Sequence, residues 1–214
     1  MSKWSHSKKT KVRLIIGGSG VGALAGLGLW WHRHGEECPY GPRWVGDVPR
    51  PTLSRTRLAG ILRPKPGERM LEIGPGYGHY TPSVAQVLGP DGSLEILDVR
   101  QALLDQTIDR VTTAGLTNVT ATRGDARRLP YPDRHFDGAY LVACLGEVPD
   151  RGAAIEELAR VLQPGGRLVV GETAADPHRV RHPDLLKLAM RAGLRSGPLI
   201  GRVSYFARFD RPAS

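Results

Sequence analysis

From residue 52 onward, short apolar segments alternate with amphipathic segments of helical length. The apolar segments cover residues 69–74, 93–99, 119–125, 136–145 and 166–172. Apolar side chains recur at helical spacing in residues 52–62, 80–89, 101–115 and 150–162. A helix after a strand returns the chain to the edge where the next strand starts, so consecutive strands run parallel. The pattern therefore predicts an α/β fold whose mostly parallel sheet is covered by helices on both faces.

Three glycines stand at every second position in the sequence MLEIGPGYGHYT, Met70 to Thr81, directly after the first apolar segment. Glycine loses more conformational freedom on folding than any other residue. Gly74, Gly76 and Gly78 therefore indicate a sharp turn, or a place where the backbone leaves room for something else. We expect a ligand to bind against this turn.

Four acidic residues stand at or just after the ends of the first four predicted strands. They are Glu72, Asp98, Asp125 and Glu147. In an open α/β sheet, ligands bind outside the carboxyl ends of the strands. Any one of these acids alone would be interpreted as a solvated loop residue. Four of them in register beside the glycine turn predict a shared binding edge.

These stretches resemble the class I S-adenosylmethionine-dependent methyltransferases. The matching stretches are MLEIGPGYGHYT, LEILDVR, GDARRLPYPDRHFDGAYL and ELARVLQPGGRLVVGE. Within that class they are most similar to the ubiquinone/menaquinone-biosynthesis type, the type 11 group. Members of this group have a common fold but different substrates. The resemblance covers about residues 50–210 and implies a doubly wound, Rossmann-like sheet of seven strands. We expect the methyltransferase domain to occupy residues 52–214.

The resemblance also implies which residues bind the cofactor. Gly74, Gly76 and Gly78 would let the backbone pass close to the amino-acid part of S-adenosylmethionine, with Glu72 holding the turn and the cofactor's ammonium. Asp98 matches the acid that accepts hydrogen bonds from both ribose hydroxyls. The other implied contacts are those of Asp125 and the Ala126 amide with the adenine, and those of Leu141, Val142 and Ala143 with the sulfonium and its methyl group.

Glu147 is the candidate catalytic residue. A sulfonium is already an activated methyl donor, so holding the acceptor in line with the methyl group supplies much of the acceleration. A base is needed only if the nucleophile must lose a proton. Where many relatives carry histidine after the fourth strand, this chain has LGEVPD, with Glu147. The alternative is a solvated acid at a helix start. Candidates for the acceptor side are His79, Tyr80, Tyr40 and Trp44.

Several other kinds of site are not indicated. The chain has no GxxxxGK[ST], GxSxG or HExxH motif, and Cys38 and Cys144 lie far apart without the spacing of a zinc site. We therefore expect no metal and a methyltransferase that acts on a small-molecule or lipid-like acceptor. Two alternatives remain. One is a methyltransferase-like protein that binds cofactor without catalysis, and the other is a basic nucleic-acid-binding protein.

The charge distribution bears on the nucleic-acid alternative. The formal net charge of +9 divides into +5 for residues 1–50, −1 for residues 51–175 and +5 for residues 176–214. Basic flanks suit nucleic acid, an anionic lipid surface or an acidic substrate. No basic stripe interleaved with aromatic residues distinguishes among these partners, and we expect nucleic acid not to be one.

Residues 14–31, LIIGGSGVGALAGLGLWW, form an uncharged run that follows four basic residues. This length is close to the minimum for a membrane span, and tryptophans favour the interface. We expect residues 1–33 to form a basic, membrane-associated segment with a hydrophobic helix, and residues 34–51 to form a linker. Gly18, Gly22 and Gly26 would let two such helices form a homodimer. The alternatives are a signal peptide cleaved after Ala25 and a soluble arm.

The side of the membrane follows from two opposing considerations. Five Lys and Arg residues precede residues 14–31 and three follow within about twenty residues, so the positive-inside rule would export the domain. The cofactor is made and held in the cytosol, however. We therefore expect the catalytic domain on the cytoplasmic side.

Overall fold

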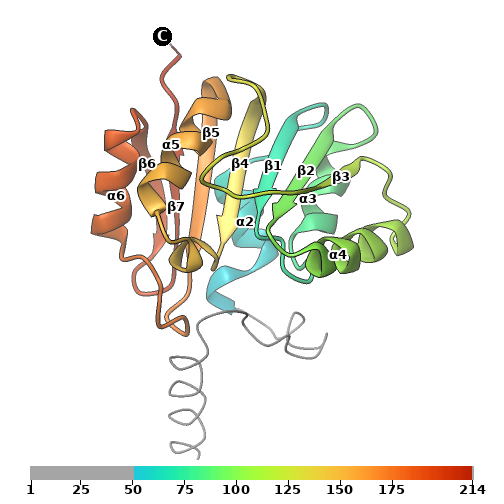
Figure 1. Cartoon of the computed structure of the whole chain (residues 1–214), viewed down its shortest axis with the longest axis horizontal. Coiled ribbons are helices and arrows are strands. Elements are labelled where there is room, and N and C mark those ends of the chain that lie inside the picture. Colours follow the sequence, from blue (N-terminus) through green and yellow to red (C-terminus); the bar gives the residue numbers. More distant parts are fainter. Residues whose placement is uncertain (1–50, 214) are drawn as a thin grey trace, which may run out of the picture. The chain divides into compact units, whose positions relative to one another are not determined.

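Seven strands form one mixed sheet in the computed structural model, which describes residues 51–213 (Figure 1). In chain order they are β1 (Arg69–Ile73), β2 (Ser93–Asp98), β3 (Val119–Arg123), β4 (Phe136–Val142), β5 (Leu162–Glu172), β6 (Arg195–Gly201) and β7 (Tyr205–Asp210). Their spatial order is β3-β2-β1-β4-β5-β7-β6. Strands β1 to β5 pair in parallel, whereas β7 pairs antiparallel with β5 and β6. The predicted doubly wound, mostly parallel sheet of seven strands is confirmed.

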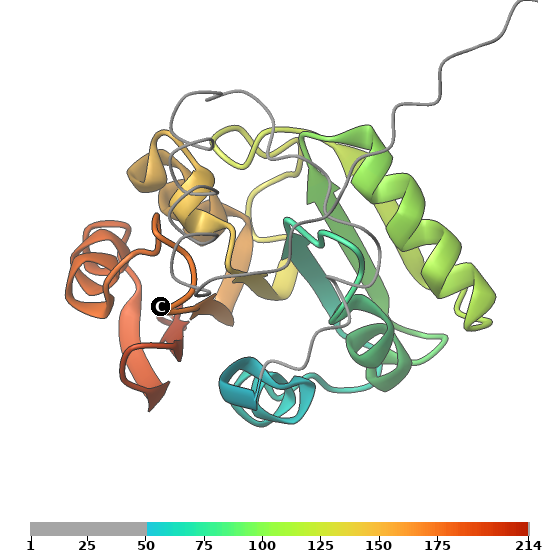
Figure 2. The same cartoon turned by 90° about the horizontal axis from the view of Figure 1, so that it is seen from below.

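Helices cover both faces of this sheet (Figures 1 and 2). The α-helices are α2 (Arg55–Leu62), α3 (Thr81–Leu88), α4 (Gln101–Thr113), α5 (Arg151–Val161) and α6 (His182–Arg191). Short 3-10 helices are η2 (Pro51–Leu53) and η3 (Leu145–Glu147). Apolar residues of α2, α3 and α4 form one buried cluster with the sheet, and those of α5 and α6 form another. The central strands contribute to both clusters, as expected of a sheet that is covered on both faces.

The order of the strands places a switch point beside β1. From β1 the chain moves outward to β2 and β3, and then crosses to the other side of β1 to form β4 and β5. In open α/β sheets with such a switch point, ligands bind outside the carboxyl ends of the strands. The predicted acids lie at this edge.

Strand β5 begins earlier than the sequence pattern predicts. The pattern places this strand at residues 166–172, but the strand runs continuously from Leu162 to Glu172. An irregularity appears as a shift of register opposite β4, between Phe136 and Gly138. Gly165, with φ of 81°, supplies a backbone conformation that other residues rarely adopt.

The expected membrane segment, its hydrophobic helix and most of the expected linker lie outside the described residues. Among residues 51–213, no helix is both long and apolar enough to cross a membrane.

Candidate active site

The turn after β1 requires glycine at three positions, and the reason differs among them. Gly74, Gly76 and Gly78 have φ values of 65°, 58° and 69°. A Cβ atom on Gly74 would lie 2.8 Å from the Sγ atom of Cys144, and one on Gly78 would lie 3.0 Å from the Cγ2 atom of Thr107. A Cβ atom on Gly76 would have no protein atom within 4 Å. Gly76 is therefore where the turn leaves open space for a ligand.

Helix α4 holds this turn in place. The hydroxyl of Thr107 donates to the Gly76 carbonyl at 3.0 Å, and the guanidinium of Arg110 donates to the Tyr77 carbonyl at 3.3 Å. On the other side, the Gly74 amide donates to the Leu97 carbonyl of β2 at 2.8 Å. These bonds fix the turn before any ligand binds, which lowers the ordering cost of binding.

Glu72 lies beneath the turn, with 2% of its surface exposed. The Thr81 hydroxyl at the start of α3 donates to its Oε2 atom at 2.6 Å, so this contact ties β1 to α3. Burial raises the pKa of Glu72 to about 7, although the hydroxyls of Thr81 and Tyr140 work in the opposite direction. The position agrees with the implied role of holding the turn, and a contact with the cofactor's ammonium remains a prediction.

Asp98, at the end of β2, is 5% exposed, and only one of its carboxylate oxygens accepts hydrogen bonds from the described residues. Its Oδ1 atom accepts from the backbone amide of Arg100 at 2.9 Å and from the Arg100 guanidinium at 3.3 Å. Its Oδ2 atom is buried without a hydrogen-bond partner among the described residues. A buried carboxylate oxygen normally has a donor. Asp98 is therefore built to accept hydrogen bonds from a ligand.

Asp125 lies farther out and is already paired. Its side chain is 40% exposed, and the Arg127 guanidinium contacts both of its oxygens, at 3.0 and 2.7 Å to Oδ2 and 3.1 Å to Oδ1. These hydrogen bonds lower the pKa of Asp125. The next residue, Ala126, is buried. Contacts of Asp125 and the Ala126 amide with an adenine ring therefore remain predictions.

The end of β4 makes an unusual bend. Ala143 has a φ of 52°, a left-handed conformation that non-glycine residues adopt rarely and at some cost. Its amide donates to the Gly171 carbonyl of β5 at 2.8 Å. Leu141 packs in the core, whereas Val142 is only half-buried. Of the two β4 residues predicted to lie beside the sulfonium, Val142 has the side chain nearer to solvent.

The bend directs Cys144 toward the glycine turn, where its thiol donates to the Ile73 carbonyl at 3.4 Å. Burial raises the pKa of the Cys144 thiol well above its usual value, and four carboxylates add to the rise. They are Glu147, Glu172, Asp98 and Glu72. Three of the four predicted acids thus act electrostatically on Cys144, while Asp125 is not among them.

Glu147, the candidate base, ends η3 and is exposed at the rim of this edge. Neighbouring protein atoms raise its pKa by desolvation, and Arg100 opposes the rise.

The fourth acid near Cys144, Glu172, was not predicted. It ends β5 and is fully buried. The sequence LVVGE contains the signal that would have found it, because Glu172 ends a strand as Asp98 does.

The other residues considered for the acceptor side give no direct support. The Tyr80 hydroxyl donates to the Leu53 carbonyl at 2.7 Å, and its ring packs edge-on against His79. Tyr80 therefore supports the fold, while Tyr40 and Trp44 lie outside the described residues. No group of His, Cys, Asp or Glu residues that could hold a metal ion occurs in the described part of the chain.

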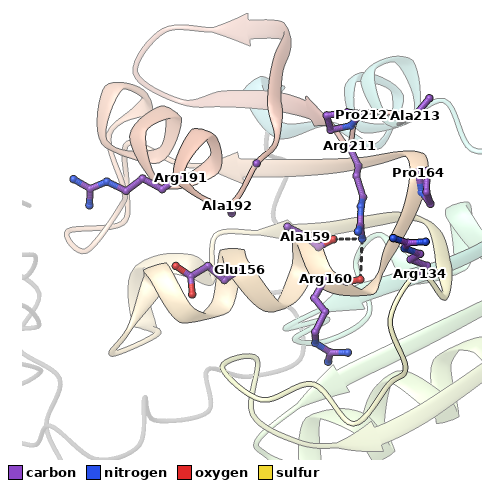
Figure 3. A pocket seen from close by; sticks show the side chains of 11 residues that line it. Arg134, Glu156, Ala159, Arg160, Pro164, Arg191, Ala192, Arg211, Pro212 and Ala213 are labelled. Carbon is purple, nitrogen blue, oxygen red and sulfur yellow. Dashed lines mark hydrogen bonds between the residues drawn. The ribbon is translucent and has the colours of Figure 1, made fainter.

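A cavity of about 560 Å³ lies elsewhere, near the start of β5 (Figure 3). Two of its four arginines serve the fold. Arg211 donates to the Ala159 and Arg160 carbonyls at 2.6 and 2.9 Å, which caps the end of α5. Arg160 itself pairs with Asp133 and Glu157, each at 2.7 Å. Because Pro164 of this cavity lies near one end of β5 and Glu172 lies at the other, the cavity is not part of the acidic edge.

Comparisons with known proteins agree with this geometry. Residues 70–166 match the methyltransferase domain family. The chain is 38% identical over 116 residues to the ubiquinone/menaquinone biosynthesis C-methyltransferase UbiE of Ectopseudomonas mendocina, a match that covers 54% of this chain and 44% of that protein. The chain thus spans less than half the length of this relative.

Two solved structures share the fold. One is a SAM-dependent methyltransferase from Aquifex aeolicus, with a TM-score of 0.68 and 18% identity over 87% of this chain and 97% of that one. The other is the [4+2]-cyclase SpnF, with a TM-score of 0.67 and 21% identity over 75% of this chain and 80% of that one.

The fold and the family match show a methyltransferase domain of the class I, S-adenosylmethionine-dependent type in residues 70–166. Over about half of the chain, the sequence is similar to C-methyltransferases of ubiquinone/menaquinone biosynthesis. The residues present fit the cofactor of the class, because Asp98 offers a buried acceptor oxygen and Gly76 offers open backbone.

Proposed function

We propose that this protein transfers a methyl group from S-adenosylmethionine to a carbon of a hydroxylated aromatic ring of the quinol type. The observation that carries the cofactor assignment is the buried, unpartnered Oδ2 atom of Asp98 beside the Gly76 turn. The names of the relatives, which are C-methyltransferases of ubiquinone and menaquinone biosynthesis, support the acceptor class. The broader expectation of a small-molecule or lipid-like acceptor includes this choice.

Each part of the edge has a proposed role. Asp98 accepts from the ribose hydroxyls, the Gly74–Gly78 turn receives the amino-acid end, and the loop after β3 receives the adenine. When bound, S-adenosylmethionine supplies a methyl group already activated by the positive sulfur. The protein then needs mainly to hold the acceptor in line and to exclude water. Methylation of a ring carbon replaces its C–H bond, so a proton must leave, and Glu147 at the rim is proposed to accept it or to orient the acceptor while water accepts it.

An Asp98→Ala variant tests the cofactor site. The substitution leaves two ribose hydroxyls without their acceptor, so we expect the Kd for S-adenosylmethionine to rise roughly tenfold to hundredfold, about 1–3 kcal/mol. Calorimetry on the full chain measures this directly, with the exposed Asp91→Ala as the matched control. Equal affinity in the Asp98 variant and the parent would remove the assignment.

The acceptor is tested with the cofactor carrying an isotopically labelled methyl group. Incubation with a lipid extract and with simple hydroquinones should give products heavier by one labelled methyl on a ring carbon. Cofactor binding without transfer to any acceptor would favour a catalytically silent protein, an outcome made reasonable by the cyclase that shares this fold.

Nucleic acid remains the less favoured partner. Arginines of the basic C-terminal part already serve the fold, since Arg208 pairs with Asp210 at 2.7 Å and Arg211 caps α5. Salt-sensitive binding of the full chain to RNA or DNA would contradict this preference.

We also propose membrane association through residues 14–31, with the domain on the cytoplasmic side and a homodimer through the glycines of that segment. The support is the uncharged sequence and the cytosolic supply of the cofactor. A tag after Ser214 should be protected from protease in intact spheroplasts and should fractionate with membranes. Recovery of all full-length protein in the soluble fraction would contradict the association.

A further inference from the structure

Glu172 is a buried carboxyl group that the proposed mechanism does not use. It ends β5, at the same edge of the sheet as Glu72 and Asp98, and it is 0% exposed. By hydrogen-bond geometry neither of its carboxylate oxygens has a partner among the described residues, although the Val180 amide lies close enough to lower its pKa. Native proteins rarely leave both oxygens of a buried carboxyl unpaired, so such a group calls for a functional explanation.

The positively charged groups around Glu172 do not restore its pKa to the ordinary value. Burial and the nearby Asp176 raise its pKa to about 7. The Val180 amide and the guanidinium groups of Arg151 and Arg179 act in the opposite direction without cancelling the rise. On β7 the neighbour in register is Tyr205, whose hydroxyl is occupied in donating to the Val180 carbonyl at 2.7 Å. Glu172 therefore exchanges its proton near neutral pH.

Cys144 shows where the field of Glu172 acts. The thiol lies against the glycine turn, and Glu172 is among the carboxylates that raise its pKa. The other carboxylates are Glu147 on η3, Asp98 on β2 and Glu72 on β1. Arg100 and His178 have the opposite effect on Glu147, because their positive charge lowers its pKa. The negative potential thus converges where β4 meets the turn that the proposed function assigns to the methionine end of the cofactor.

Methyl transfer changes the charge of the cofactor at this point. S-adenosylmethionine carries a positive sulfur, whereas S-adenosylhomocysteine, the product, has a neutral thioether. A buried negative charge attracts the first and has no comparable attraction for the second. In a protein interior this attraction acts over several ångströms because it is weakly screened.

We propose that Glu172 makes the site selective for the positively charged cofactor over its neutral product, an inference that rests on the proposed function. Glu172 acts through its charge and need not touch the ligand. Binding of the cation shifts Glu172 toward its ionised form and releases part of a proton. After transfer the attraction is lost, and the product leaves more readily.

Calorimetry with both ligands tests this proposal on the full chain. At pH 8, Glu172→Gln should weaken binding of S-adenosylmethionine roughly fivefold to tenfold and leave that of S-adenosylhomocysteine unchanged. The exposed Glu156→Gln is the matched control, and Glu172→Asp should retain most of the preference. Equal weakening of both ligands would show a merely structural role and overturn the proposal, as would an unchanged ratio of the two Kd values.

Proton release gives a second readout that does not depend on turnover. At pH 6.5, the parent should release a fraction of a proton on binding S-adenosylmethionine, measured in buffers of different ionisation enthalpy, and the Glu172→Gln variant should release less. Carbon-13 NMR of the Glu172 carboxyl should show its titration move to lower pH with the cofactor but not with the product. No movement with either ligand would overturn the proposal. Failure of the parent to bind either ligand would instead remove the proposed function, and this inference with it.

Discussion

Gly74 and Gly76 have the same kind of backbone conformation but different surroundings, which makes them a matched pair. Alanine at either position meets the strain of a positive φ, about 1–2 kcal/mol. At Gly74 the new Cβ atom would also lie 2.8 Å from Sγ and 2.9 Å from Cβ of Cys144, so overpacking adds about 1–3 kcal/mol. We expect Gly74→Ala to lower the free energy of unfolding more than Gly76→Ala, as measured by urea denaturation.

The two variants should also differ in cofactor binding. Gly76→Ala adds a methyl group on the open side of the turn, where the ligand is proposed to lie, so it should weaken the binding of S-adenosylmethionine. Its free energy of unfolding should fall only by the cost of the positive φ. Equal stabilities of the two variants would show that the contact between Gly74 and Cys144 is easily relieved.

At the residue scale, the sequence was most informative where a role depends on backbone position. Asp98 and Glu72 could be predicted because they stand at or near the ends of strands that meet at one edge. The pairing of Asp125 with Arg127 and the left-handed Ala143 could not, because both depend on side-chain and loop geometry that no spacing encodes. Glu172 was missed although its position at a strand end was readable.

Arg167, at the scale of elements, fastens helix α2 to the sheet. It lies on β5 with 7% of its surface exposed and donates to the Leu62 and Arg63 carbonyls at the end of α2. It also forms two hydrogen bonds with Glu68, at 3.0 and 2.5 Å. Although burial acts in the other direction, bonds from Arg167 and the Lys65 amide lower the pKa of Glu68.

Breaking this fastening should be costly. Arg167→Met leaves the Glu68 charge and the helix carbonyls without their donor, so we expect a loss of about 3–5 kcal/mol in the free energy of unfolding. Chemical denaturation measures the loss, with the exposed Arg195→Met as control. Adding Glu68→Gln should recover part of it, because the unpaired charge is then gone. A loss below about 1 kcal/mol would contradict the role of Arg167.

Among the elements, the first five strands and four helices were predictable because each has a clear apolar pattern. The last two strands were not predicted from their pattern, although β7 is largely apolar, and only the family resemblance implied them. β6, RSGPLIG, is an edge strand with glycine and proline inside it, and such strands lack the usual alternation. The membrane segment, the linker and the proposed dimer remain predictions.

The stability of the whole molecule should depend on pH through two buried glutamates. The pKa of both Glu72 and Glu172 is raised to about 7 in the folded protein, from 4.5. Between these values the folded state binds more protons than the unfolded state, so stability falls as pH rises. The stabilisation is complete below about pH 4.5 and is lost above about pH 7. Each group should contribute about 3 kcal/mol.

Urea denaturation at pH 5.5 and pH 8.5 measures this dependence. A variant with both Glu72→Gln and Glu172→Gln should show a smaller decrease, since glutamine keeps the shape without the ionisation. Glu156→Gln should behave like the parent. A parent whose stability rises across this range would contradict the assignment and would point to carboxylates with lowered pKa, such as Glu157.

The place of β7 also affects how the chain is made in the cell. Strand β7 (Tyr205–Asp210) lies between β5 and β6, although it follows both in sequence. A ribosome therefore releases every other strand before the one that completes the sheet. Until β7 emerges, the edge of β5 from Arg167 to Glu172 has no partner on that side, and an open strand edge invites pairing with other chains. The nascent domain is thus most exposed to mispairing just when most of its sheet is already present.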